Sequence, residues 1–343
     1  DTDTYADGHE VLKGSDPNVA SSVPSGIDMI VALDASKLDP GPLAEWPNEG
    51  IQGGVFAASP DVPEVATVQG VNGVSFNGST QYYTGPGVPS FLAGDGARTI
   101  EAWIQNPAAA DEETIFSWGR RGGGDGSNLS FNHGLNATFG AVGHWGAPDM
   151  GWEGQIEENQ WTYVVYTYDP ELQTATVYRD GEYVIDELVG PLSTWATDST
   201  PEMRPLPFRV ASQNEANGNP TGGLRGSMTI ARIRVHDAAL EASDIENQFE
   251  AESDEFGLVD YDDDGLPTWY ERLYAFLDER DPTDAPKDED SDTLDNLGEF
   301  EEGTIPDNPD TDGDDATDGK EVNQTLTNPL IADTDQDGLR DGV

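Results

Sequence analysis

The stretch "WTYVVYTYD" (Trp161–Asp169) sets the pattern for the central part of the chain. It is rich in β-branched and aromatic residues, and its side chains alternate between two faces with the period of a β-strand. The next stretch, "TATVYRDGEYVIDE" (Thr174–Glu187), contains two similar runs separated by Asp180 and Gly181. Because an Asp-Gly pair accepts the positive φ angles of a tight turn, this segment is predicted to be a β-hairpin.

Further short runs of strand-like composition lie on both sides of this hairpin. Each is bounded by Gly, Pro or Asn, as is typical of strands that end in turns. They are "TIEAWIQN" (Thr99–Asn106), "ETIFSWG" (Glu113–Gly119), "NLSFNHG" (Asn128–Gly134), "ATFGAVG" (Ala137–Gly143) and "SMTIARIRVHD" (Ser227–Asp237). A short helix is expected after them, because Ser243 and Glu246 form a capping box. Many short strands without a long helical period predict a mainly β fold, a β-sandwich.

The charge of the chain excludes several kinds of partner. Its 343 residues include 67 acidic and 16 basic ones, which gives a formal net charge of −51. Non-specific binding of nucleic acid is excluded, because it requires Lys and Arg against the phosphates. Adsorption to anionic membranes is equally disfavoured. There is no cysteine for disulfides, so bound cations are the expected means of stabilising an exported protein.

Neither a membrane span nor a leader is expected from the sequence. No apolar run approaches the roughly 18 residues of a transmembrane helix, so membrane insertion is not expected. The chain opens on Asp1 rather than Met and lacks a charged-then-apolar leader. It is therefore expected to be an excised or processed fragment.

The acidic residues concentrate at the C-terminal end. Residues 252–343 contain 31 acidic and 5 basic residues, whereas residues 1–251 contain 36 and 11. Within this tail a twelve-residue pattern recurs, with Asp at positions 1, 3 and 5 and Glu at position 12. The complete copies are "DYDDDGLPTWYE" (Asp260–Glu271), "DEDSDTLDNLGE" (Asp288–Glu299) and "DTDGDDATDGKE" (Asp310–Glu321), and a fourth begins at Asp333. This spacing matches the EF-hand type of calcium loop.

Positions 1, 3, 5, 7, 9 and 12 of these loops are the predicted ligands of several Ca²⁺ ions, position 7 through its carbonyl group. They are Asp260, Asp262, Asp264, Leu266, Thr268 and Glu271; Asp288, Asp290, Asp292, Leu294, Asn296 and Glu299; Asp310, Asp312, Asp314, Ala316, Asp318 and Glu321; and Asp333, Asp335, Asp337, Leu339 and Asp341. Position 6 is Gly265 and Gly338 in two loops but Thr293 and Asp315 in the others, which makes those two less ideal. The alternative is an acidic linker without bound ions.

The N-terminal stretch fits part of the same loop. In "DTDTYADGHE", Asp1, Asp3, Tyr5, Asp7 and Glu10 would occupy positions 3, 5, 7, 9 and 12. The chain is therefore expected to begin within one repeat and to end within another, as a segment of a longer array.

These repeats resemble thrombospondin type 3 repeats of the bacterial kind. The resemblance includes the connectors "KGSDPN" (Lys13–Asn18), "LDERDPTDA" (Leu277–Ala285) and "GTIPDNPDTD" (Gly303–Asp312). It implies calcium-stiffened, disulfide-free rods of large extracellular proteins. One segment, "LPTWYERLYAFLD" (Leu266–Asp278), places aromatic and aliphatic residues at helical spacing. We interpret it as a helix that leaves the first loop and packs on the neighbouring domain, and a ligand site formed by its aromatic residues is the weaker alternative.

The central region resembles the laminin-G-like, concanavalin A-like jelly roll. The residues that carry this likeness are "VSFNGSTQYY" (Val74–Tyr83), "RTIEAWI" (Arg98–Ile104), "QWTYVVYTYD" (Gln160–Asp169), "TVYRDGEYV" (Thr176–Val184) and "GSMTIARIRVHDAALEASDIENQF" (Gly226–Phe249). Three domains are thus expected: a partial calcium repeat at 1–18, a jelly roll at 19–251 and calcium repeats at 252–343. The fold alone does not fix the function, because lectins, adhesion modules, glucanases and structural spacers share it.

No enzyme motif is present. The chain lacks the Glu-x-Asp-x-x-Glu strand of glucanases with this fold, and it lacks a Gly-x-Ser-x-Gly elbow. "HEVLK" begins like a zinc-protease helix at His9, but Lys13 stands where the second histidine is required. We therefore expect a protein that is not an enzyme.

A ligand site is more plausible between Phe116 and Gly154, where aromatic, basic and polar residues gather among glycines. Flat aromatic rings suit sugar rings, and Asn, Asp or Arg suit hydroxyl groups. The candidates are Arg120, Arg121, Asn128, His133, His144, Trp145 and Trp152. The alternative is that the tryptophans belong to the core and the arginines pair with carboxylates. For Trp103, Trp118 and Trp161 the core is favoured.

Three functions remain open. The first is a calcium-stabilised extracellular or cell-surface adhesion module that binds a glycan or a surface protein. The second is a structural repeat subunit of a fibre or giant surface protein, assembled head-to-tail through its calcium-repeat ends. The third, a glycan-degrading enzyme, lacks its motif.

Overall fold

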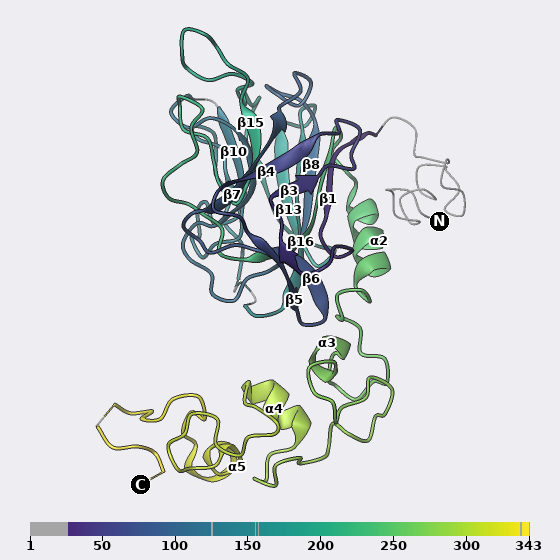
Figure 1. The fold of residues 1–343 in the computed structure, drawn as a ribbon, viewed down its shortest axis with the longest axis vertical. Helices are drawn as coiled ribbons and strands as arrows, with labels where there is room; N and C mark the ends of the chain where they lie inside the picture. The colour runs from purple at the N-terminus through teal and green to yellow at the C-terminus, as the bar shows by residue number, and fades with distance from the viewer. Residues whose placement is uncertain (1–26, 125, 155, 157, 337, 343) are drawn as a thin grey trace. The chain divides into compact units, whose positions relative to one another are not determined.

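A computed structural model describes residues 27–124, 126–154, 156, 158–336 and 338–342. The chain divides into two units with a boundary between Glu252 and Ser253. The first unit is built from two antiparallel sheets, as a β-sandwich requires (Figure 1). The prediction of a mainly β sandwich is confirmed. None of the described helices is both long and apolar enough to cross a lipid bilayer.

Nine strands form the larger sheet, with β1 joining at the side of β16. In spatial order they are β14 (Glu182–Leu188), β13 (Thr174–Arg179), β12 (Trp161–Asp169), β8 (Arg98–Gln105), β16 (Thr229–His236), β6 (Val71–Ser75), β5 (Glu64–Val68) and β2 (Gly41–Pro42), together with β1 (Met29–Asp34). The predicted hairpin is β13–β14, and its turn residues Asp180 and Gly181 have φ angles of 50° and 79°. These angles are those that an Asp-Gly turn favours.

Seven strands form the second sheet. Their order is β11 (Val142–Gly143), β10 (Asn128–Asn132), β9 (Thr114–Gly119), β15 (Pro207–Val210), β7 (Gln81–Gly87), β4 (Val55–Pro60) and β3 (Glu45–Pro47). The prediction of a strand over Ala137–Gly143 was wrong for residues 137–141. The side chain of Asn136 accepts the N–H groups of Thr138 and Phe139, and this local turn replaces strand pairing there.

The core lies between the two sheets and contains Phe56, Phe116 and Phe208 in mutual ring contact. Trp103, Trp118 and Trp161 are buried, as expected for core tryptophans. Helix α2 (Ala242–Glu252) lies beside the strands of the larger sheet (Figure 1). The ring of Phe249 on α2 stacks on Trp103 and Tyr163 of that sheet.

The last residue of α2 is held by a network of charges. The carboxylate of Glu252 accepts hydrogen bonds from Trp103 Nε1 at 2.7 Å, Arg232 Nη1 at 2.7 Å and Arg234 Nη1 at 3.2 Å. Glu101 in turn accepts from Tyr163 and contacts His236. These contacts fix the end of α2 against the larger sheet.

The second unit consists of loops joined by short helices. They are α3 (Thr268–Glu271), α4 (Asn296–Glu302), α5 (Asp318–Lys320) and the π-helical turn η1 (Glu321–Thr325). The prediction of a helix over Leu266–Asp278 was wrong beyond Glu271, because the chain leaves the helix at Arg272. Within this unit a small core contains Leu266, Tyr270, Leu277 and Ala285, and it is surrounded by Trp269, Tyr274, Phe276, Leu297 and Phe300.

Candidate metal sites and a candidate binding surface

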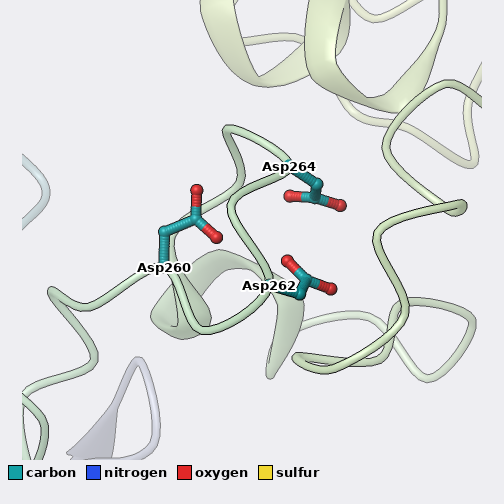
Figure 2. A group of neighbouring side chains, drawn as sticks. All are labelled: Asp260, Asp262 and Asp264. Atoms are coloured by element: carbon teal, nitrogen blue, oxygen red, sulfur yellow. The ribbon is translucent and has the colours of Figure 1, made fainter.

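The first acidic loop brings three carboxylates together. Asp260, Asp262 and Asp264 each offer an oxygen atom, and these atoms lie within 4.8 Å of one another. Figure 2 shows the three carboxylates directed toward one region of the loop. The backbone N–H of Gly265, whose φ angle is 96°, donates to Asp260 Oδ2 at 2.9 Å. A sharp turn at position 6 therefore places the first and fifth residues of the loop near each other.

The second and third loops repeat this geometry. Asp288, Asp290 and Asp292 form one cluster, and a further cluster consists of Asp310, Asp312 and Asp314. Position 6 has a φ angle of 86° at Thr293 and 81° at Asp315, although neither is glycine. Each of these residues donates its N–H to the first Asp of its loop at 3.0 Å. The hydrogen bond is thus kept at a conformational cost that glycine would avoid.

The glutamates at position 12 are buried, and two of the three have carboxylates that accept no hydrogen bond from the described residues. Glu271 is 1% exposed and Glu299 is 2% exposed, and none of the described residues donates a hydrogen bond to any of their four carboxylate oxygens. Burial, reinforced by neighbouring aspartates, raises the pKa of each to about 8. The pKa of Glu321 rises to about 7 for the same reason, burial being the largest cause. A bare carboxylate in such a position is costly unless a proton or a cation accompanies it.

Each of the first two glutamates has an aspartate from outside its own loop beside it. Asp284 lies with Asp264 and Glu271, and Asp318 lies with Asp292 and Glu299. The sequence reasoning missed Asp284, because it falls in a connector and out of register with the loop pattern. The loop pattern assigned Asp318 to the third loop, and the structure also places it in a cluster with Asp292 and Glu299 of the second loop.

Position 9 offers further oxygen atoms in the first two loops. Thr268 Oγ1 and Asn296 Oδ1 are buried and have no hydrogen-bond partner in the part of the chain that the structure describes. These clusters therefore contain only oxygen donors, most of them charged, and this donor set suits a hard divalent cation.

The fourth loop is described in part. Asp333 Oδ2 accepts the N–H of Gly338 at 2.9 Å, and Asp341 Oδ2 accepts the N–H of Thr334 at 3.0 Å. Asp337 lies outside the described residues, as do the predicted N-terminal ligands Asp1, Asp3, Tyr5, Asp7 and Glu10.

Most of the candidate ligand residues of the sandwich are buried. They are Arg120, Asn128, His133, His144 and Trp152. The ring of His144 contacts the Pro148 carbonyl at 2.6 Å and the Tyr166 hydroxyl at 3.1 Å. Burial lowers the pKa of His133 to about 3 and that of His144 to about 4, so both are neutral at pH 7. Asn128, His133, His144 and Trp152 contribute to the interior rather than to an open surface.

Two tryptophans are exposed on either side of the turn between β9 and β10. Trp145 is 40% exposed and Trp195 is 37% exposed. Backbone hydrogen bonds of 3.2 Å join Trp145 O to Gly126 N and Trp195 N to Ser127 O. The guanidinium carbon of Arg121 lies 4.8 Å from the Trp145 ring centroid, and that of Arg120 lies 3.9 Å from the Trp195 ring centroid.

We call the four residues Arg120, Arg121, Trp145 and Trp195 the Arg–Trp surface. Three of them were candidates from the sequence, and Trp195 was missed. Trp195 is distant in sequence from the glycine-rich stretch, and only the fold brings it to Arg120. Such an arrangement provides flat apolar rings for a ligand and guanidinium groups for its polar substituents.

A separate cavity of about 600 Å³ opens next to this region of the sandwich. Its walls include Met150, Trp152 and Ile185 together with the acidic residues Asp149, Glu153 and Glu187. No basic residue lines this cavity among the described residues.

Residues 77–246 match the family model described as the concanavalin A-like lectin/glucanases superfamily. Residues 77–246 are a laminin-G-type domain of that superfamily, as the sequence resemblance implied. A comparison with curated proteins gave no match.

Several solved structures are similar to this chain. Domain 4 of AbnA, an extracellular arabinanase from Geobacillus stearothermophilus, is 14% identical with a TM-score of 0.44, over 64% of this chain and 98% of that one. The binding domain of botulinum neurotoxin serotype G is 14% identical with a TM-score of 0.44, over 68% and 53%. Trypanosoma rangeli sialidase is 19% identical with a TM-score of 0.40, over 70% of this chain and 35% of that one.

Proposed function

We propose that this chain is a glycan-binding module whose acidic C-terminal unit is ordered by calcium ions. The observation that carries the glycan-binding function is the Arg–Trp surface, which lies on a domain of a lectin and glucanase superfamily. Sugar rings present apolar C–H faces that stack on indole, and their hydroxyl groups accept hydrogen bonds from guanidinium. Both requirements are met at one turn of the sandwich.

Calcium is proposed because of the buried glutamates. Glu271 and Glu299 offer four carboxylate oxygens without partners, next to aspartates of the same clusters. Ca²⁺ takes six to eight oxygen ligands, and a glutamate at position 12 supplies two of them. The loop spacing, similar to that of thrombospondin type 3 repeats, supports this assignment. We also propose that the protein lies outside the cell or on its surface. Calcium modules of extracellular proteins have Kd values of about 10⁻⁴ to 10⁻³ M, and we expect affinities in this range.

A glycan array tests the binding function. Wild-type protein should give a narrow set of hits, and a Trp145→Ala, Trp195→Ala double variant should lose them while it keeps the melting temperature of the sandwich. A variant with Tyr183→Ala, which removes another exposed aromatic ring on β14, should bind as the wild type does. A blank array from folded wild-type protein would contradict the proposal, and release of reducing sugar would identify an enzyme instead.

A further inference from the structure

Arg121 differs from the other arginines described in the sandwich. Arg232 and Arg234 pair with carboxylates, and Arg209 and Arg225 donate to oxygen atoms of neighbouring groups. Among the described residues, none accepts a hydrogen bond from the Arg121 guanidinium or forms an ion pair with it; its contact is the Trp145 ring. Its donors are thus available to a ligand.

The same surface has no described acidic partner. Arg120 donates to the Ala216 carbonyl at 3.4 Å, and no described carboxylate forms an ion pair with Arg120 or Arg121. The chain has 67 acidic residues against 16 basic ones. Two adjacent cations that form no ion pair with a described carboxylate are unusual in so acidic a chain, and they could accept a negatively charged group of a ligand.

The backbone of Trp145 is strained. Its φ angle is 54°, in the left-handed region that bulky residues avoid. Asp149 supports this conformation, because its carboxylate accepts the N–H of His144 at 2.7 Å and also a hydrogen bond from the Trp145 backbone. Glycine or asparagine would fit this backbone better, and the exposed ring contributes little to the core. Strain of this kind is concentrated at functional sites.

We propose that the Arg–Trp surface binds an anionic sugar, whose carboxylate or sulfate group is held by Arg121 while its ring stacks on Trp145. This inference rests on the proposed glycan-binding function and specifies the substrate class. A guanidinium group forms two parallel hydrogen bonds with a planar carboxylate and matches sulfate similarly. The acidic cavity lined by Asp149, Glu153 and Glu187 would repel the same ligand, so the anionic sugar is directed to Arg121.

The test compares charged and neutral forms of one glycan. An array with neutral, carboxylated and sulfated glycans identifies the preferred ligand. Titration calorimetry then measures that ligand beside its methyl ester or its desulfated form, which removes the charge and keeps the sugar ring. Wild-type protein should prefer the charged form by about 10- to 100-fold, as expected for hydrogen bonds between charged groups. Loss of affinity in the methyl ester identifies a carboxylate as the bound group, and loss of affinity in the desulfated form identifies a sulfate ester.

Three variants test which residues cause the preference for the charged glycan. Arg121→Gln should abolish the preference, so that the charged and the neutral form bind with equal affinity. Lys37→Gln is the control, because it removes one positive charge from the loop that follows β1 in the other sheet. It should change neither the preference for the charged form nor the affinity for the neutral form. Trp145→Gly relieves the strained backbone, so it should lose glycan binding without a lower melting temperature.

The outcomes separate this inference from the proposed function. Equal binding of both ligand forms, with loss of binding in Trp145→Gly, would overturn the anionic preference and leave glycan binding intact. An anionic preference that persists in Arg121→Gln would overturn the role of Arg121. If folded wild-type protein binds no glycan, both proposals fail.

Discussion

Glu271 shows, at the scale of one residue, the physical basis of the proposed calcium sites. Its buried carboxylate has no hydrogen-bond partner, and Asp264 and Asp284 lie beside it. Glu271→Gln removes a buried charge and one bidentate ligand. We expect this variant to lose the calcium-dependent stabilisation of its site, about 2.7 kcal/mol at a calcium concentration of one hundred times Kd. Thermal unfolding with calcium and with chelator measures the difference.

Glu301→Gln is the matched control, because Glu301 is an exposed residue of α4 in the same unit. Glu301→Gln should keep the full calcium-dependent increase in melting temperature. An equal shift in Glu271→Gln and in wild type would exclude Glu271 as a ligand.

The raised pKa values of the buried glutamates predict a pH dependence of the calcium-free protein. The pKa of Glu271 and of Glu299 is about 8 in the folded unit, against an ordinary value of 4.5. The folded state therefore binds more protons than the unfolded state between pH 4.5 and about 8. Stability must fall as pH rises through this window. In chelator, the melting temperature of this unit should fall from pH 5 to pH 6.5 and again to pH 8. A melting temperature that rises with pH would contradict the prediction.

At the scale of the element, the stability of α2 depends on its last residue. Glu252 accepts hydrogen bonds from Trp103, Arg232 and Arg234, and its side chain is mostly buried. Glu252→Gln removes the shared carboxylate of two buried guanidinium groups and leaves them the longer ion pairs with Asp34 at 3.3 Å and Glu101 at 3.5 Å. We expect a loss of about 3–5 kcal/mol in the free energy of unfolding of the sandwich, measured by denaturant unfolding. Glu246→Gln changes an exposed residue of the same helix and should cost less than about 0.5 kcal/mol.

At the scale of the whole molecule, calcium should act on one unit and not on the other. Removing it leaves the carboxylates of residues 253–343 to repel one another, and this unit should expand. Calorimetry should show one transition that moves to lower temperature in chelator and one, from the sandwich, that does not. Magnesium should restore the first transition less well, because Mg²⁺ requires near-octahedral geometry and gives up its waters reluctantly. A single unfolding transition whose temperature is the same with calcium and with chelator would refute the calcium assignment.

The sequence alone determined the features that depend on local spacing. Alternation in Trp161–Asp169 and the Asp180-Gly181 turn predicted a β-hairpin, because both the side-chain period and the turn angles are set by neighbouring residues. The Asp spacing of the loops likewise predicted which carboxylates converge, since a tight turn brings positions 1, 3 and 5 together.

Only the tertiary structure decided which distant residues complete a site. It placed Asp284 beside Glu271, Asp318 beside Glu299 and Trp195 beside Arg120. It also buried His133 and His144, which the sequence had grouped with the exposed Trp145. No local period encodes such contacts, because they depend on how loops from separate parts of the chain fold back on one another. The sequence thus identifies the class of fold and the acidic loops, and the packing of distant segments determines which residues lie together at each candidate site.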